Sequence, residues 1–339
     1  MITALQPYLA AIEDELRAMV STPAEAVAPL YDMMAYHLGW LDERLQPVDA
    51  YHGKRLRPLL CLLACEAAGG DWHTALPAAA SLELVHNFSL IHDDIEDNSP
   101  TRRARPALWT LWGLAHGINV GDTMLMMARG AMTLLSEQGT DAATVLAAVH
   151  ILDQTCLSLC QGQYFDIAYE ALLEVTEDAY LQMIGAKTAT LIAASTQLGA
   201  LIAGAGERTE HFRQFGWQLG LAFQMVDDIL GIWGDPATTG KPTASDIGSR
   251  KMTLPVIFAL RDREQGKELA ALYRKEHLSE QDVCRAVAIL NQTGARSYVR
   301  KRAVQYEAST LAALDAAGAR PPAADHLRRL ATSLTSREK

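Results

Sequence analysis

Apolar residues recur with a helical period along nearly the whole chain. Strong helix formers dominate, and alternating β-branched runs, which would indicate strands, are absent. Neither a sustained heptad nor a 30–50-residue repeat is present, and no Pro/Ser-rich linker divides the chain. We therefore predict an all-α fold, a large single-domain helical bundle (1–339) around a central apolar cavity, with helices over 3–20, 24–44, 54–68, 74–98, 118–137, 141–171, 177–203, 208–233, 253–264, 267–276, 280–293, 296–317 and 323–335.

Local signals refine this pattern. The segments 177–203 and 208–233 are apolar nearly all round, which predicts that they are buried. Thr176 and Ser279 have the residue type and position of helix N-caps, and Ser279 is followed three residues later by Asp282. The irregular segments 99–117 and 234–252 each follow an acidic cluster. They are long for connections, which favours a function over mere linkage.

Composition narrows the class of protein. The 339 residues include 49% apolar and 21% charged residues, and 30 basic against 40 acidic residues leave a net charge of −10. An acidic surplus disfavours a nucleic-acid partner. The N-terminus lacks the basic start of a signal peptide, and no uncharged apolar run reaches the ~20 residues of a membrane span, the longest being Ala189 to Gly204. We expect a cytoplasmic protein without a transmembrane segment.

Cysteines form two pairs at helical spacing. Cys61/Cys65 and Cys156/Cys160 are each four residues apart, so each pair lies on one helix face. Four thiolates could hold a metal, but five cysteines in this chain are more typical of small buried core residues. We favour burial for both pairs.

The most distinctive motif is an acidic cluster at the end of an apolar helix. Asp93, Asp94, Glu96 and Asp97 place four carboxylates in five residues, near a helix C-terminus where the helix dipole disfavours them. Asp93 and Asp97 share a face one turn apart. A sequence tolerates this arrangement when cations bind there.

A second acidic pair, Asp227 and Asp228, ends another apolar helix, and Gln224 precedes Asp228 by one turn. The simplest arrangement places the two acidic helices face to face across a cavity. Carboxylates without a His/Cys set suit Mg²⁺, which takes its other ligands from water and phosphate. Either cluster alone would equally fit a solvated acidic surface.

Basic residues near both clusters favour a ligand. Arginine binds phosphate through paired hydrogen bonds, and lysine binds it as a point charge. Lys187 lies within an apolar helix, where a charge needs a partner, and Asp166 adds a carboxylate to another apolar helix. Together these residues predict a polyphosphate ligand held partly by metal; the other basic positions are Lys54, Arg55, Arg57, Arg102, Arg103, Lys241 and Lys251.

At this point the chain resembles the trans-isoprenyl diphosphate synthases, the polyprenyl synthetase family, over residues 50 to 260. The resemblance rests on seven segments in the family's order: GKRLRP, HNFSLIHDDIEDNSPTRRARP, GDTML, GQYFD, KTATL, FQMVDDILG and GKPTASDIGSRKMTLP. The segment DDILGIWGDPATTGKP is most similar to bacterial short-chain synthases of the geranylgeranyl type.

The resemblance implies a role for each matching residue. Asp93 and Asp97, with Asp94 beside them, would hold two Mg²⁺ ions, and Asp227, supported by Asp228, a third. The implied contacts to the allylic diphosphate are Arg102, Lys187, Thr188, Gln224, Lys241 and Lys251. Those to isopentenyl diphosphate are Lys54, Arg57, His86 and Arg103.

The implied reaction is Mg²⁺-dependent condensation of isopentenyl diphosphate with dimethylallyl, geranyl or farnesyl diphosphate. Family members often limit chain growth at the fourth and fifth residues before the first aspartate, here Ser89 and Phe88. With the small Ser89 one turn below Asp93, we expect farnesyl to geranylgeranyl products, favouring geranylgeranyl. The resemblance also implies a homodimer.

The sequence departs from the family pattern at three positions. Gly231 stands where many members carry a third aspartate in the second motif, and Ala104 and Ala107 replace the usual Gly and Thr. Three alternatives stay open. They are a class I terpene cyclase, which would not need the isopentenyl diphosphate residues, a non-catalytic subunit of a heteromeric synthase, and a prenyltransferase with an aromatic acceptor.

Overall fold

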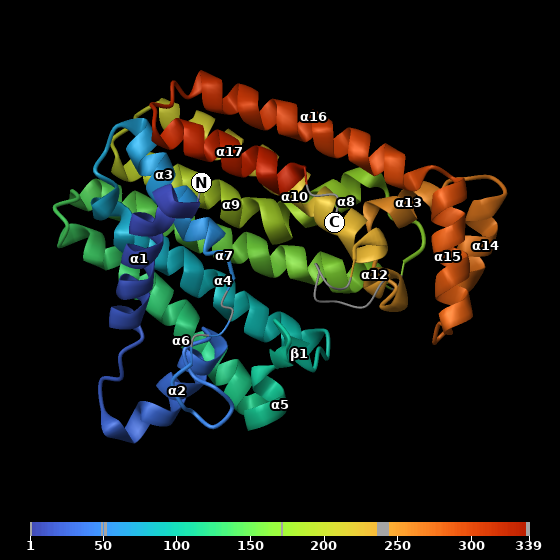
Figure 1. The fold of residues 1–339 in the computed structure, drawn as a ribbon, viewed down its shortest axis with the longest axis horizontal. Helices are drawn as coiled ribbons and strands as arrows, with labels where there is room; N and C mark the ends of the chain where they lie inside the picture. Colours follow the sequence, from blue (N-terminus) through green and yellow to red (C-terminus); the bar gives the residue numbers. More distant parts are fainter. Residues whose placement is uncertain (1, 49, 51–52, 171, 236–243, 337–339) are drawn as a thin grey trace. The chain divides into compact units, whose positions relative to one another are not determined.

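The computed structural model describes the chain except for residues 1, 49, 51–52, 171, 236–243 and 337–339. The described residues form an all-α fold with one short hairpin (Figure 1). Its α-helices are α1 (Ile2–Met19), α2 (Ala28–His37), α3 (Leu56–Ala68), α4 (Leu76–Glu96), α5 (Leu108–Trp112), α6 (Leu114–Thr133), α7 (Ala142–Glu170), α8 (Glu177–Ile184), α9 (Thr190–Ile202), α10 (Arg208–Trp233), α12 (Ser245–Gly248), α13 (Leu254–Leu260), α14 (Gln265–Tyr273), α15 (Glu280–Gln292), α16 (Ala295–Ala316) and α17 (Ala323–Thr335).

Shorter elements connect these helices. The 3-10 helices are η1 (Glu25–Val27), η2 (Trp72–Ala75) and η3 (Leu134–Ser136), and Gly185–Ala189 (η4) is a π-helix between α8 and α9. The strands β1 (Thr101–Arg102) and β2 (Arg105–Pro106) pair antiparallel directly after α4.

The chain divides into two compact units. The first comprises Met1–Cys156, Ala194–Arg213 and Ala316–Leu327, and the second comprises Leu157–Ala193, Gln214–Asp315 and Arg328–Lys339. The first acidic motif belongs to the first unit and the second motif to the second unit. The expectation of a single domain with the two motifs face to face across an apolar cavity stays a prediction.

In the first unit, α4 is surrounded by apolar contacts and carries the first acidic motif at its end. Leu82 and Leu84 are fully buried. Two glycines let α6 pack closely on the last turns of α4: a Cβ at Gly117 would lie 2.7 Å from Ile95 Cδ1, and a Cβ at Gly121 would lie 2.2 Å from His92 Nε2. Close packing at these positions holds the motif in place.

The second unit has its own core. It joins residues of α8, α10, α13, α14 and α15, among them the fully buried Tyr180 and Met225. Burying side chains of this size stabilises the unit by roughly 1.5–3 kcal/mol for each large apolar residue. The core therefore fixes α10 and its acidic motif against α8 and α13.

Four expected segments differ from the structure. The segment 234–252, expected to be irregular, contains α12 in its described part. The helix expected over 24–44 ends at His37, because Leu38 and Gly39 turn the chain and Gly39 has a φ of 87°. The segment 99–117, expected to be irregular, contains the hairpin, α5 and the start of α6. The helix expected over 177–203 is interrupted by η4. A π-helix widens one turn without changing the apolar pattern, so periodicity does not reveal it.

The cysteine expectation is half right. Cys61 and Cys65 are buried, and burial raises the pKa of each thiol. Cys156 is half-buried and Cys160 is exposed, so the prediction of core burial is wrong for this pair. The two pairs belong to different helices, α3 and α7, and α7 leaves much of its surface to solvent.

One described helix, α7, is long and apolar enough to cross a membrane by length and composition alone. The longest apolar run in the sequence, Ala189 to Gly204, lies elsewhere. Two carboxylates of α7 form ion pairs with basic residues of the protein: Asp153 with Arg129, and Asp166 with Lys187. Core and interface helices of soluble proteins meet the same length test, so α7 is weak evidence for a membrane span.

Candidate active site

The first acidic motif occupies the last turn of α4 in the first unit. Asp93 is half-buried, Asp94 is 2% exposed, and Asp97 is the exposed C-cap, whose backbone N–H donates to Asp93 O over 2.8 Å. The expected helix end is confirmed. The three carboxylates differ sharply in their exposure to solvent, so they differ in which ligands can reach them.

Asp94 is held by the hairpin that follows the motif. Arg102 on β1 donates from Nε to Asp94 Oδ1 over 2.9 Å, and its Nη2 forms a second contact with the same oxygen. Burial raises the pKa of Asp94, and the Arg102 guanidinium opposes that rise. We conclude that Asp94 orients Arg102. Its burial makes it a poorer metal ligand than Asp93 or Asp97.

Several arginines and two histidines lie near this motif: His86 is half-buried and His37 is buried. Burial, and then the charges of Arg57 and Arg103, lower the pKa of His86. His37, at the end of α2, is 9% exposed, and burial followed by the charge of Arg103 lowers its pKa as well. Both imidazoles are therefore neutral at pH 7. Concentrated guanidinium charge favours an anion such as a diphosphate.

Arg55, the residue just before α3, has a structural role. It is 4% exposed and forms ion pairs with Glu83 on α4 (2.8 Å) and Glu13 on α1 (3.2 Å). Its neighbour Lys54 is exposed and Arg57 is half-buried. The ion pairs of Arg55 anchor the start of α3. Lys54 and Arg57 are thereby placed where solvent reaches them.

The second acidic motif ends α10 in the second unit, and its two aspartates have different environments. Asp227 is half-buried, whereas Asp228 is 3% exposed. Asp228 accepts hydrogen bonds from Tyr180 OH (2.7 Å), Gln224 Nε2 (3.0 Å) and the backbone N–H of Leu254 (3.2 Å). Burial raises the pKa of Asp228 to about 7, although Gln224 and Tyr180 oppose the rise. Asp228 thus ties α10 to α8 and α13.

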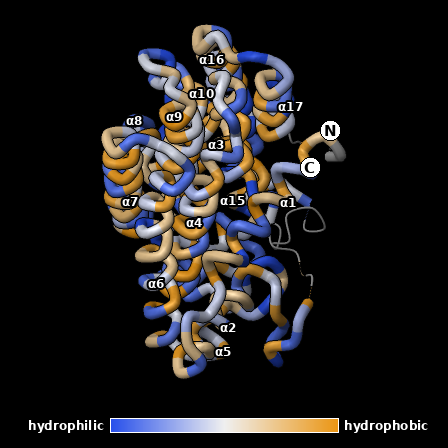
Figure 2. The backbone as a smooth tube through the Cα atoms, turned by 90° about the vertical axis from the view of Figure 1, so that its left-hand side faces the viewer, coloured by the Kyte–Doolittle hydropathy of each residue, from blue (hydrophilic) through white to orange (hydrophobic). Residues whose placement is uncertain are grey.

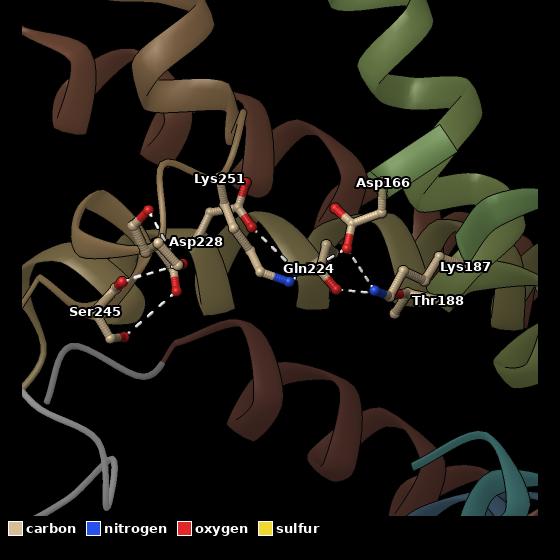
Figure 3. A network of polar contacts seen from close by, with 9 residues as sticks. Asp166, Lys187, Thr188, Gln224, Asp228, Ser245 and Lys251 are labelled. Atoms are coloured by element: carbon tan, nitrogen blue, oxygen red, sulfur yellow. Dashed lines mark hydrogen bonds and ion pairs between the residues drawn. The ribbon is translucent and has the colours of Figure 1, made fainter. Parts of the chain in front are cut away.

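A chain of hydrogen bonds leads from Asp228 to the π-helix. Thr188 Oγ1 donates to Gln224 Oε1 over 2.7 Å, and Gln224 in turn donates to Asp228 (Figure 3). The structure thus brings Thr188, Gln224 and Asp228, all expected site residues, into one network.

Two lysines converge on one carboxylate beside this network. Lys187 Nζ lies 2.5 Å from Asp166 Oδ2, and Lys251 Nζ lies 3.3 Å from the same atom (Figure 3). Burial would raise the pKa of Asp166, but the two lysine charges outweigh it and the pKa is lowered. The partner expected for Lys187 is therefore Asp166. Two ammonium groups beside one carboxylate leave a positive surplus for an anionic ligand.

A glycine allows Lys187 to reach this position. Lys187 is in the π-helix η4, and a Cβ at Gly162 on α7 would lie 2.3 Å from its backbone N. Only a residue without a side chain lets α7 approach the π-helix this closely. π-Bulges occur frequently at functional sites.

Sequence reasoning missed several groups that build the site. Tyr180 and His37 resembled ordinary core residues in their apolar helices, so no local signal distinguished them. Asp166 was noticed as a carboxylate, but its partners come from 21 and 85 residues away. Lys241, an expected substrate contact, lies outside the described residues.

The carboxylates fit Mg²⁺ by the chemistry of their donor atoms. Among the described residues, no group of three or more His, Cys, Asp or Glu side chains forms a preassembled metal site. Mg²⁺ typically uses one or two carboxylates and completes its shell with water and substrate phosphate. The half-buried Asp93 and Asp227 and the exposed Asp97 are carboxylates that fit that requirement.

These features define an all-α enzyme class with two aspartate motifs and basic residues beside each one. The polyprenyl synthetase family model matches residues 39–290. The chain is 43% identical to a geranylgeranyl diphosphate synthase of Mycobacterium tuberculosis over 84% of this chain and 81% of that protein. It is 45% identical to a (2E,6E)-farnesyl diphosphate synthase of Mycobacterium bovis over 77% and 73%, respectively.

Solved structures agree with these sequence comparisons. A polyprenyl synthetase from Streptomyces coelicolor A3(2) superposes with a TM-score of 0.89 at 36% identity, covering 98% of this chain and 99% of that one. The chain therefore belongs to the polyprenyl synthetase family and is a trans-prenyltransferase.

Proposed function

We propose that this enzyme is a Mg²⁺-dependent, chain-elongating synthase. It condenses isopentenyl diphosphate with an allylic diphosphate and has geranylgeranyl diphosphate as its main product. One observation supports this most directly. In each acidic motif one aspartate is buried and hydrogen-bonded, Asp94 by Arg102 and Asp228 by Tyr180, while its neighbour remains accessible. Each motif thus combines a buried, hydrogen-bonded aspartate with a neighbour that is partly exposed to solvent.

The accessible carboxylates are the proposed metal ligands. Asp93 and Asp97 would hold two Mg²⁺ ions and Asp227 a third. When bound, Mg²⁺ supplies Lewis-acid stabilisation of charge on the departing diphosphate. The proposed allylic contacts are Arg102, Lys187, Thr188, Gln224, Lys241 and Lys251, and the first four of these, together with Lys251, are held by the hydrogen bonds described above.

The remaining basic group is proposed to bind isopentenyl diphosphate. Lys54, Arg57, His86 and Arg103 belong to the first unit, where burial, and then the arginine charges, lower the pKa of His86 and keep it neutral. A neutral imidazole can donate one hydrogen bond to a phosphate without adding charge. After the allylic carbon–oxygen bond breaks, the double bond of isopentenyl diphosphate attacks the allylic cation. The proton then lost passes to the released pyrophosphate.

The test is to incubate the purified protein with Mg²⁺ and isopentenyl diphosphate. Dimethylallyl, geranyl and farnesyl diphosphate are supplied in separate reactions, and the products are separated by chain length. We expect elongated diphosphates ending at geranylgeranyl. Pyrophosphate release with cyclic hydrocarbons and no use of isopentenyl diphosphate would indicate a terpene cyclase instead. No turnover with any primer would indicate a non-catalytic subunit.

We also infer that the enzyme is a cytoplasmic homodimer. On α6, Leu114, Ile118 and Met126 are exposed at spacings of four and eight residues, which places them on one face. On α7, Leu146 and Tyr164 are 71% and 68% exposed, and hydrophobic residues recur along both helices (Figure 2). Such apolar stripes are typical of an interface with a second copy of the chain.

The dimer is tested by light scattering on an Ile118→Lys/Met126→Lys variant. We expect its mass to be half that of the wild-type protein. Val304→Lys, at an exposed apolar position on α16, is the control and should leave the mass unchanged. Equal masses for all three proteins would place the interface elsewhere or exclude it.

A further inference from the structure

Gly231 on α10 has a carboxylate where its side chain would be. A Cβ built at this position would lie 2.0 Å from Asp246 Oδ2 and 2.5 Å from Asp246 Cγ. Real Cβ atoms do not approach other atoms so closely, so Asp246 occupies the space that any side chain at 231 would require. Position 231 follows Asp227 by one helical turn and therefore lies on the same face of α10.

Asp246 reaches α10 from a well-defined turn. It lies in α12, after Ala244, which has a left-handed backbone with a φ of 56°, and before the buried Ile247. The backbone N–H of Lys251 donates to Asp246 O over 2.9 Å. The same turn thus delivers the Lys251 ammonium to Asp166 and the Asp246 carboxylate to α10.

The charge of Asp246 also affects a residue of another helix. Burial, and then Asp246, raise the pKa of Tyr273 on α14. This effect agrees with the contact at Gly231, which places the Asp246 carboxylate beside the face of α10 that carries Asp227.

We propose that Asp246 supplies the second motif with the carboxylate that α10 lacks at position 231. In this view Asp246 helps Asp227 to hold Mg²⁺ with diphosphate, and Gly231 is required because it leaves room for the Asp246 side chain. A carboxylate oxygen on the Asp227 face is the ligand type that Mg²⁺ selects, either directly or through bound water. The inference rests on the proposed Mg²⁺–diphosphate site.

The experiment measures binding without turnover. Inorganic pyrophosphate is added to the purified protein, Mg²⁺ is titrated, and the Mg²⁺ midpoint for the pyrophosphate-induced rise in melting temperature is recorded. For Asp246→Ala we expect the midpoint to rise by about 10-fold, the scale of losing a residue that supports a metal site. Gly231→Ala, which displaces the carboxylate without removing it, should raise the midpoint as well. Melting without ligand reports whether each variant folds.

The decisive variant moves the carboxylate back onto α10. In Gly231→Asp/Asp246→Ala the new side chain has the room that Asp246 gave up, and we expect the midpoint to return to within about 3-fold of wild type. Asp178→Ala removes an exposed carboxylate elsewhere in the second unit and should leave the midpoint unchanged.

Three results would overturn the inference. An unchanged midpoint in Asp246→Ala would remove Asp246 from the metal site. A double variant no better than Asp246→Ala would reduce Asp246 to a structural residue of its turn. Failure of the wild-type protein to respond to Mg²⁺ and pyrophosphate would remove the proposed metal site itself, and the inference with it.

Discussion

At the scale of single residues, adjacent aspartates in the site have different chemistry because their partners differ. Asp94 is held by Arg102, and Asp228 by Tyr180, Gln224 and the Leu254 backbone. A buried carboxylate that loses its hydrogen-bond donors destabilises the folded protein. These two residues therefore act through the groups they position.

Tyr180→Phe tests this role of Asp228. The substitution removes the 2.7 Å hydrogen bond to a buried carboxylate, and the free energy of unfolding should fall by about 1–3 kcal/mol in chemical denaturation. Tyr164→Phe, at a 68% exposed position on α7, should change it by less than about 0.5 kcal/mol. Equal effects of the two substitutions would show that the Tyr180 hydroxyl does not stabilise Asp228.

The hairpin after the first motif contains two residues with a strained backbone. Arg103 and Ala104 have φ values of 54° and 60°, a left-handed backbone that glycine adopts at least cost. We expect Ala104→Gly to raise the free energy of unfolding by about 1 kcal/mol, measured by chemical denaturation. Ala107→Gly is the matched control, because Ala107 has an extended backbone with a φ of −66° and is 1% exposed. It should give no gain. A loss for Ala104→Gly would mean that the turn is not strained.

At the scale of elements, the π-helix η4 packs closely against α7. The wider turn of the π-helix directs Lys187 toward Asp166, and Gly162 permits the contact between the two helices. Neither feature follows from propensity, because the residues 185–189 would be acceptable in an ordinary α-helix.

Gly162→Ala should disrupt the contact between α7 and the π-helix. Its new Cβ meets backbone atoms of Lys187 and Ala186, which cannot rotate away, so the free energy of unfolding should fall by about 1–3 kcal/mol. Affinity for allylic diphosphate should fall as well, measured by calorimetry. Gly130→Ala, on an exposed face of α6 with no atom within 4 Å, should stabilise the protein slightly. If Gly162→Ala behaved like Gly130→Ala, the contact would be unimportant.

The N-terminus of α15 has a capping box, as Ser279 and Asp282 predict. Thr176 is the N-cap of α8, and its side chain accepts a hydrogen bond from the backbone N–H of Ala179. The hydrogen bond from Lys275, followed by those from Ser279, lowers the pKa of Asp282 from 3.8 to about 2. Because the folded protein binds this proton more weakly than the unfolded chain, ionised Asp282 contributes stability fully above pH 4. This contribution declines as pH falls toward 2.

Asp282→Asn tests the capping contribution. The variant should be less stable than wild type at pH 6, and the difference should shrink as pH falls below 4. Urea denaturation at several pH values measures it. A constant difference would show that the charge of Asp282 does not contribute.

At the scale of the whole molecule, we expect product length to depend on two side chains that precede the first motif on α4. Phe88 is 6% exposed and contacts His92 edge-to-face at 5.6 Å between ring centroids. Ser89 is half-buried, and its hydroxyl donates to His86 O over 2.9 Å. Both lie within the turn and a half of α4 before Asp93.

We expect Phe88→Ala to lengthen the main product by one or more isoprene units and Ser89→Phe to shorten it. Products from isopentenyl and farnesyl diphosphate are compared by chromatography. Phe88→Leu should give an intermediate distribution because it removes less volume. Unchanged product lengths would exclude Phe88 and Ser89 from the limit on chain growth.

The sequence by itself determined most helices, the order of the motifs and the family. These features depend on apolar period, caps and residue types within a few turns of chain, and all of those can be read locally. The sequence did not predict the end of α2 at His37, the hairpin or the π-helix. Each of these depends on backbone geometry that leaves the apolar pattern unchanged.

Only the tertiary structure decided which carboxylates are buried and what holds them. Tyr180 meets Asp228 across 48 residues, and Lys251 meets Asp166 across 85. The carboxylate beside Gly231 comes from a separate turn of the chain. Burial and hydrogen bonding depend on which segments the folded core brings together. Identical residue types therefore become anchors or ligands only in three dimensions.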